Sequence, residues 1–193
     1  QREMYRVPSG LRENDCFSFP LENCFPAGRG SVLDLGAIFP HDVSMILELH
    51  SPLDMHLHLR DGDMLKLVAP LSSASFAGAV IMPNLVPPVA DADAVQAYRQ
   101  RVLDACGDDV FQPYMTAFFR SYSEKELSRL KELVFGIKLY PAGATTNSEG
   151  GVKAMKDAEA TLSIMQEMDI PLLVHGESHG FVMDREAEFL DVY

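Results

Sequence analysis

The 193-residue sequence lacks the features of several protein classes. It has no run of roughly 18 to 20 apolar residues, the length that a membrane-spanning helix requires. Its start, Gln1-Arg2-Glu3, lacks the apolar segment of a secretory signal peptide. Positive charge is scarce, since 16 lysines and arginines stand against 28 acidic residues and give a net charge of -12. We therefore expect a cytoplasmic protein with neither nucleic acid nor a membrane as partner, which binds any anionic substrate through local cations.

Cysteine is also scarce, and no internal repeat or low-complexity segment occurs. The cysteines, Cys16, Cys24 and Cys106, are widely spaced and form no Cys-x-x-Cys pair. Neither a disulfide framework nor a cysteine zinc site is predicted, and we expect reduced thiols. The sequence does contain 47% hydrophobic and 23% charged residues, which is the balance of a globular protein, and its length favours one domain.

Residues 1–44 differ from the rest because prolines and glycines interrupt them and no apolar period persists. We expect an irregular leader or a non-native extension there, with Met45 as a possible natural start. The chain opens on Gln1 and stops at Tyr193, just after a helical pattern begins. This favours a piece of a longer protein.

From about residue 46, short apolar runs alternate with longer amphipathic stretches, the pattern of strand and helix units around a parallel sheet. The predicted strands are 53–59, 79–82, 111–117, 136–139 and 172–175. The predicted helices are 64–76, 90–106, 123–133 and 152–168, with a fifth beginning near Asp184. Asp91 is the predicted cap of the second helix, whose positions Ala94, Val95, Tyr98 and Val102 share one face.

This α/β pattern fits either an open doubly wound sheet or the first part of an eight-stranded barrel. Periodicity alone does not choose between them. A complete (β/α)₈ barrel takes about 250 residues, so a barrel would be incomplete here, with about its first five strands present.

Polar residues at the predicted strand ends point to a binding site, because ligands bind beyond the carboxyl ends of parallel strands. His56 and His58 lie two apart on the first strand and share a face, while Leu57 faces the other way. Two imidazoles on one face suit Zn²⁺. Taken alone, the pair also fits two solvated or hydrogen-bonded histidines.

Two further strands bring unusual residues to the same rim. Lys138 stands within the apolar strand 136–139, where burying an unpaired ammonium costs several kcal/mol. It is therefore either a lysine that reaches solvent at the strand end or one that is modified or paired. His175 ends the last predicted strand and, taken alone, fits a core histidine. Together with His56 and His58, these residues predict a metal site.

Four motifs in this order are similar to those of bacterial-type (class II) dihydroorotases of the amidohydrolase superfamily. They are His56-Leu57-His58-Leu59-Arg60-Asp61-Gly62, Met82-Pro83-Asn84-Leu85 with Pro87-Pro88, Lys138-Leu139-Tyr140-Pro141-Ala142 through Thr145-Thr146-Asn147, and Leu172-Leu173-Val174-His175-Gly176-Glu177. The resemblance runs from about Leu53 to the end of the chain. It implies a (β/α)₈ TIM-type barrel with two zinc ions at its mouth. The implied reaction is the reversible cyclisation of N-carbamoyl-L-aspartate to L-dihydroorotate in pyrimidine synthesis, in a protein that is a homodimer when complete.

The resemblance also implies the metal ligands. His56 and His58 would bind the more buried zinc, and His175 the second. Lys138 would carry a carbamate (N6-carboxylysine) that bridges both ions, which accounts for a lysine on an apolar strand. A further zinc-binding histidine and a general-base aspartate would lie beyond Tyr193. We therefore expect the 193-residue chain alone to be inactive and to expose apolar surface.

The same resemblance implies that Arg60 and Asn84 hold the substrate carboxylate and that Thr145 and Thr146 sit on a mobile loop that closes over it. The residues allow plainer interpretations. Arg60 could pair with Asp61 or Asp63, Asn84 could serve only as a turn residue, and the loop could be an ordinary solvated one. No function is expected for the remaining histidines, which are His41, His50 and His179.

Two other functions stay open. One is hydrolysis of a different cyclic amide, as by a dihydropyrimidinase or an allantoinase. The other is a non-catalytic homologue that serves in binding or assembly, which would have no need of two zinc ions. Arg60 and the loop that carries Thr145 and Thr146 favour a dihydroorotase over another cyclic-amide hydrolase.

Overall fold

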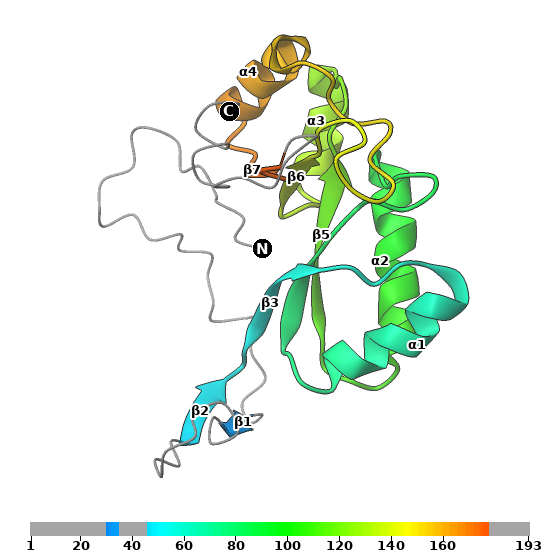
Figure 1. The fold of residues 1–193 in the computed structure, drawn as a ribbon, viewed down its shortest axis with the longest axis vertical. Helices are drawn as coiled ribbons and strands as arrows, with labels where there is room; N and C mark the ends of the chain where they lie inside the picture. Colours follow the sequence, from blue (N-terminus) through cyan, green and yellow to red (C-terminus); the bar gives the residue numbers. More distant parts are fainter. Residues whose placement is uncertain (1–29, 35–45, 178–193) are drawn as a thin grey trace.

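The computed structural model describes residues 30–34 and 46–177. Five parallel strands form a sheet in which sequence order is also spatial order (Figure 1). The strands are β3 (Leu53–Leu57), β4 (Gly78–Ile81), β5 (Gln112–Phe118), β6 (Gly136–Leu139) and β7 (Leu172–Val174). Each predicted strand coincides with an observed one to within two residues at either end.

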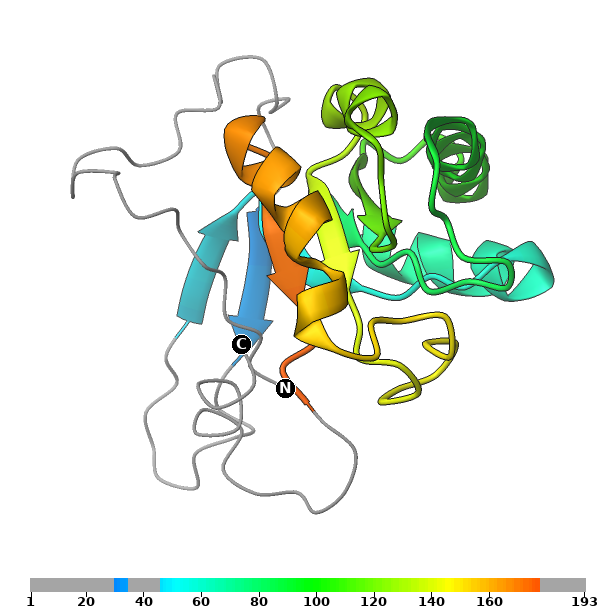
Figure 2. The ribbon, with the colours of Figure 1, turned by 90° about the horizontal axis from the view of Figure 1, so that it is seen from above.

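Helices connect the successive strands and lie on one side of the curled sheet (Figure 2). They are α1 (Gly62–Ser73), α2 (Ala92–Cys106), α3 (Glu124–Lys131) and α4 (Glu159–Glu167). The side chain of Asp91 caps α2 as predicted, since it accepts a hydrogen bond from the Ala94 amide. This repeated strand and helix order forms a curled half-barrel, which confirms the predicted incomplete (β/α)₈ TIM-type fold. None of the helices in the described residues is long and apolar enough to cross a membrane.

The two faces of the sheet are packed differently. Ile81, Ile137 and Leu139 face the helices and belong to the main hydrophobic core. Val80 and Leu173, which alternate with outward-facing residues along their strands, belong to a smaller cluster on the inner face. Side chains therefore alternate between the faces with a period of two. This alternation decides which residues of β3, β6 and β7 can reach the inside of the barrel.

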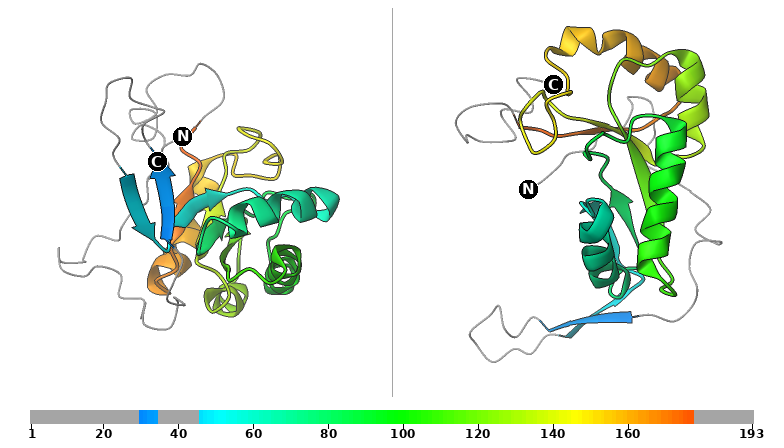
Figure 3. Two further views of the ribbon diagram at one scale, coloured as in Figure 1. Left: turned by 90° about the horizontal axis from the view of Figure 1, so that it is seen from below. Right: turned by 90° about the vertical axis from the view of Figure 1, so that its right-hand side faces the viewer.

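One segment of residues 1–44 forms a strand that the sequence pattern did not predict. Strand β1 (Gly30–Asp34) pairs antiparallel with β2 (Ile46–His50), at the amino-terminal end of β3 (Figure 3). Five residues can form such a pair through backbone hydrogen bonds without a sustained amphipathic pattern, because the partner strand supplies the bonds. The other residues of 1–44, including Cys16, Cys24 and His41, lie outside the described residues, and the domain boundary at Met45 stays a prediction.

The fourth helix begins later than predicted. Val152 pairs with Pro141 in an isolated bridge, a 3₁₀ helix spans Met155–Asp157, and α4 starts only at Glu159. The reason is that the backbone of Val152 bonds to Tyr140 and Ala142 and so closes the preceding loop. The helix predicted near Asp184 and the residue His179 lie outside the described residues.

Candidate active site

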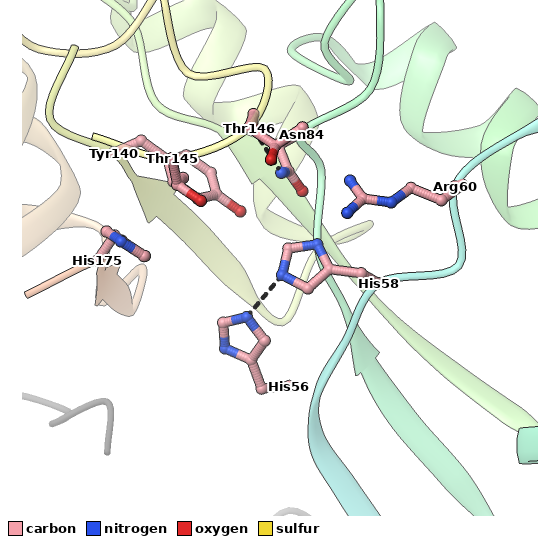
Figure 4. Close-up of a pocket in the computed structure, with 8 residues that line it drawn as sticks. All are labelled: His56, His58, Arg60, Asn84, Tyr140, Thr145, Thr146 and His175. Atoms are coloured by element: carbon pink, nitrogen blue, oxygen red, sulfur yellow. Dashed lines mark hydrogen bonds between the residues drawn. The ribbon is translucent and has the colours of Figure 1, made fainter. Parts of the chain in front are cut away.

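A cavity of about 200 Å³ lies at the carboxyl ends of the parallel strands (Figure 4). Its walls come from the segments that end or follow β3, β4, β6 and β7. The lining residues are His56, His58, Arg60, Asn84, Tyr140, Thr145, Thr146 and His175. All of these except Tyr140 were predicted site residues. The remaining predicted site residue, Lys138, is not part of the cavity wall.

The side chains of His56 and His58 both line the cavity and point toward each other (Figure 4). Their Nε2 atoms are 2.9 Å apart, and the ring centroids are separated by 4.9 Å. Leu57 packs against the outer core, as the period of two predicts. Two zinc–nitrogen bonds of about 2.0–2.1 Å at a tetrahedral angle would hold two nitrogens roughly 3.3 Å apart. The observed separation is therefore close to that of two imidazoles that share one cation.

The surroundings of His58 keep its imidazole neutral. Burial lowers the pKa of His58 to about 4, and the neighbouring His56, Arg60 and Lys138 act in the same direction. A hydrogen bond with the Asn84 side chain opposes this shift. At neutral pH the ring nitrogen consequently has a lone pair to donate, which is the form that a metal ion binds.

Lys138 lies on the inner face of β6 and is completely buried. Its Nζ donates a hydrogen bond of 3.3 Å to the carbonyl oxygen of Val174 and lies 5.5 Å from the centre of the Tyr140 ring. The interpretation as a lysine that reaches solvent is wrong, because the strand end is covered on this face. Its burial agrees with the other interpretation, that of a lysine that is modified or paired.

His175 occupies the opposite side of the cavity from His58 (Figure 4). Its backbone amide bonds to the Leu139 carbonyl at 2.9 Å, so the polypeptide still follows β6 at this point. Its Nε2 is 2.9 Å from Oε2 of Glu177. Within residues 30–34 and 46–177, no three His, Cys, Asp or Glu side chains are grouped closely enough to hold a metal ion. The three imidazoles thus line one cavity without forming one cluster.

Arg60 directs its guanidinium into the cavity (Figure 4). Asp61 and Asp63, which were alternative partners for Arg60, bind other cations. Asp61 accepts two hydrogen bonds from Arg101, at 3.0 and 2.8 Å, and Asp63 pairs with Lys66 at 3.1 Å. Arg60 therefore lies where it could meet a carboxylate in the cavity.

Asn84 is almost fully buried at the end of β4 and is more than a turn residue. Its Nδ2 donates a hydrogen bond of 2.9 Å to the carbonyl oxygen of Thr146. Thr145 and Thr146 belong to the loop between β6 and η3, the 3₁₀ helix at Met155–Asp157, and this loop covers one side of the cavity. The loop and the end of β4 are in direct contact, so the predicted substrate residues share one site.

Tyr140 is the cavity residue that was not predicted. It follows Lys138 by two positions and so falls on the same inner face, and its ring stacks on Phe118 with centroids 5.2 Å apart. The centroid of the His175 ring is 5.8 Å from that of Tyr140. The period of two that selected His56 and His58 could have selected Tyr140 as well.

Comparison with known proteins identifies dihydroorotases as relatives. No protein-family model matches the chain. A curated dihydroorotase from Salmonella arizonae is 49% identical over 156 residues, which cover 77% of this chain and 44% of that protein. A crystal structure of dihydroorotase from Campylobacter jejuni is 55% identical with a TM-score of 0.70, covering 74% of this chain and 43% of that one.

A dihydroorotase from Saccharomyces cerevisiae, crystallised with 5-fluoroorotic acid, is 30% identical with a TM-score of 0.62. It matches 72% of this chain and 42% of its own. The chain therefore spans less than half the length of these relatives. Over the matched part, the similarity to dihydroorotases that the four motifs indicated is confirmed.

Proposed function

We propose that the complete protein is a dihydroorotase, a zinc-dependent hydrolase that interconverts N-carbamoyl-L-aspartate and L-dihydroorotate in pyrimidine synthesis. The observation that carries the proposal is the cavity itself. It gathers three imidazoles, a guanidinium and a carboxamide from separate motifs at the carboxyl rim of a half-barrel. The 49% identity to a dihydroorotase, which covers 77% of this chain, supports the same proposal.

The side chains around the cavity have the chemistry of a zinc site, because imidazole nitrogen is a ligand that zinc prefers. In the proposal, His56 and His58 hold one zinc ion, His175 holds a second, and a carbamate on Lys138 bridges the two. The convergence of the His56 and His58 nitrogens and the lowered pKa of His58 support the first site. When bound, the zinc ions would activate water and polarise the amide carbonyl.

The residues of this chain provide binding and orientation for the substrate. Arg60 offers a planar fork that matches a carboxylate, in a protein whose overall charge of -12 would otherwise repel an anion. Asn84 adds an amide donor beside it, and Thr145 and Thr146 cover the bound ring. The family resemblance adds two zinc ions per subunit, a cytoplasmic location and a homodimer to the proposal.

A substrate panel on the complete gene product tests this function. L-Dihydroorotate carries a carboxylate that dihydrouracil lacks, so turnover should be confined to dihydroorotate and should require zinc. Arg60→Met should raise the KM for dihydroorotate. Turnover of dihydrouracil or allantoin in its place would favour another cyclic-amide hydrolase. A protein with neither zinc nor turnover would be a non-catalytic homologue.

A further inference from the structure

The loop over residues 141–151 is built around a buried serine. Ser148 is completely buried, and its Oγ donates a hydrogen bond of 2.6 Å to the carbonyl oxygen of Thr145. The same Oγ accepts one of 3.0 Å from the Thr145 amide. The Ser148 carbonyl accepts hydrogen bonds from the amides of Gly143 and Gly151, at 2.9 and 2.8 Å. The turn that presents the two threonines is thus organised by Ser148.

The two ends of the loop are joined to each other. The Ala142 amide donates to the Val152 carbonyl at 2.9 Å, and the Val152 amide donates to the Tyr140 carbonyl at 2.8 Å. Together with the contacts of Ser148, these bonds make the loop a closed unit with its own internal support. The position of this unit at the cavity then depends on its contacts with the rest of the protein.

Two reciprocal hydrogen bonds dock this unit on the end of β4. Nδ2 of Asn147 donates to the backbone carbonyl of Asn84 at 3.1 Å, and Nδ2 of Asn84 donates to the backbone carbonyl of Thr146 at 2.9 Å. We call these two bonds the asparagine clasp. Asn147 has a φ of 57°, in the left-handed region that asparagine tolerates better than most residues. The clasp joins segments that are 62 and 63 residues apart in the chain.

The clasp also orients a substrate-binding group. A carboxamide nitrogen has two hydrogens, and Thr146 engages one of those on Asn84. With the amide plane fixed in this way, the second hydrogen has a defined direction. Asn84 and Arg60 line the same cavity, so a carboxylate bound there would meet donors whose positions depend on the loop.

We infer that Asn147 and Ser148 are positioning residues of this site. Ser148 shapes the turn that carries Thr145 and Thr146, and Asn147 fastens that turn to the Asn84 backbone. Through the clasp they hold both threonines at the cavity and fix the Asn84 carboxamide, without touching the substrate themselves. This role rests on the proposed function, since it concerns the binding of the same substrate.

The test compares Asn147→Gly, Asn147→Asp and Ser148→Ala in the complete gene product. Glycine keeps the left-handed backbone and aspartate keeps the side-chain shape, but neither can donate to the Asn84 carbonyl. Ser163→Ala is the matched control, because Ser163 is exposed and its hydroxyl donates a hydrogen bond within α4, to the Glu159 carbonyl at 3.0 Å. Two quantities are measured, the hydrogen exchange of backbone amides in residues 143–151 and the KM and kcat for L-dihydroorotate.

Loss of one hydrogen bond should speed exchange in the loop and raise KM by about three- to tenfold, with a smaller change in kcat. Exchange in α2 and the behaviour of Ser163→Ala should match wild type. If both Asn147 variants showed wild-type exchange and wild-type KM, the clasp would not hold the loop and the inference would be overturned. Faster exchange with unchanged KM would overturn the positioning role. If the wild-type protein does not turn over dihydroorotate, the proposed function fails, while the exchange data still decide whether Asn147 and Ser148 hold the loop.

Discussion

The hydroxyl of Tyr98 on α2 donates a hydrogen bond of 2.7 Å to the backbone carbonyl of Arg60. Arg60 has a φ of 61°, a left-handed conformation that few residues other than glycine adopt without support. Arg101, three positions after Tyr98 on α2, binds the adjacent Asp61 with two hydrogen bonds. Helix α2 therefore fixes the turn from which the Arg60 side chain enters the cavity.

Tyr98→Phe should weaken substrate binding. The change keeps the buried ring and leaves the Arg60 carbonyl without this donor, which should lower the free energy of unfolding by about 1 to 2 kcal/mol. Arg60 would then lose its fixed direction, and the KM for L-dihydroorotate should rise severalfold while kcat changes less. Urea denaturation and steady-state kinetics on the complete protein measure the two effects.

Ser73→Ala is the control for Tyr98→Phe. Ser73 is buried at the end of α1 and donates a hydrogen bond of 2.7 Å to Asp109, away from the cavity. This variant should also lose stability but should keep the wild-type KM. An unchanged KM in Tyr98→Phe would mean that Tyr98 does not position Arg60.

Gly150 and Gly151, which are adjacent in the loop, provide a second prediction. A Cβ at Gly151 would overlap the Tyr140 carbonyl oxygen and approach the Ser148 carbonyl oxygen to 2.9 Å, whereas a Cβ at Gly150 would meet nothing within 4 Å. Gly151→Ala should therefore open the joined ends of the loop and raise both loop proteolysis and KM. Gly150→Ala should behave as wild type, and equal proteolysis of the two variants would contradict this account of the loop.

Substitution of His56 should reduce zinc binding, whereas substitution of the nearby His50 should not. His56 lines the cavity, whereas His50 is exposed at the end of β2. His56→Ala should lower zinc content and turnover, because it removes one nitrogen of the paired imidazoles. His50→Ala should retain the wild-type zinc content and turnover. Zinc is measured on the purified complete proteins by elemental analysis, and full zinc occupancy in His56→Ala would exclude His56 as a ligand.

The sequence predicted those features that depend on residues close together in the chain. The cap at Asp91 follows from the preference for aspartate at helix starts. The shared face of His56 and His58 follows from the alternation of side chains along a strand. The clasp between Asn84 and the loop could not be predicted in this way, because its partners meet only after three strands have paired. The contact between Tyr98 and Arg60 could not be predicted either, because it forms only when α2 packs beside the end of β3.

Lys138 is the residue on which the proposed metal centre depends most. It is completely buried on the inner face of β6. An ammonium between two divalent cations would be repelled by both, whereas a carbamate would supply an oxygen to each. Lys138→Ala should therefore lose zinc and turnover. Lys138→Arg should be no better, because a guanidinium stays cationic and cannot be carbamylated in this way.

The most direct test is the turnover of L-dihydroorotate by the complete Lys138→Ala protein with and without an added small carboxylic acid. The acid could occupy the space that the lysine leaves and bridge the metals with its own two oxygens. We predict no turnover without the acid, partial recovery of turnover and zinc content with it, and no recovery for Lys138→Arg. Near-normal turnover and two zinc ions in Lys138→Arg would contradict the bridging carbamate and, with it, the proposed metal centre.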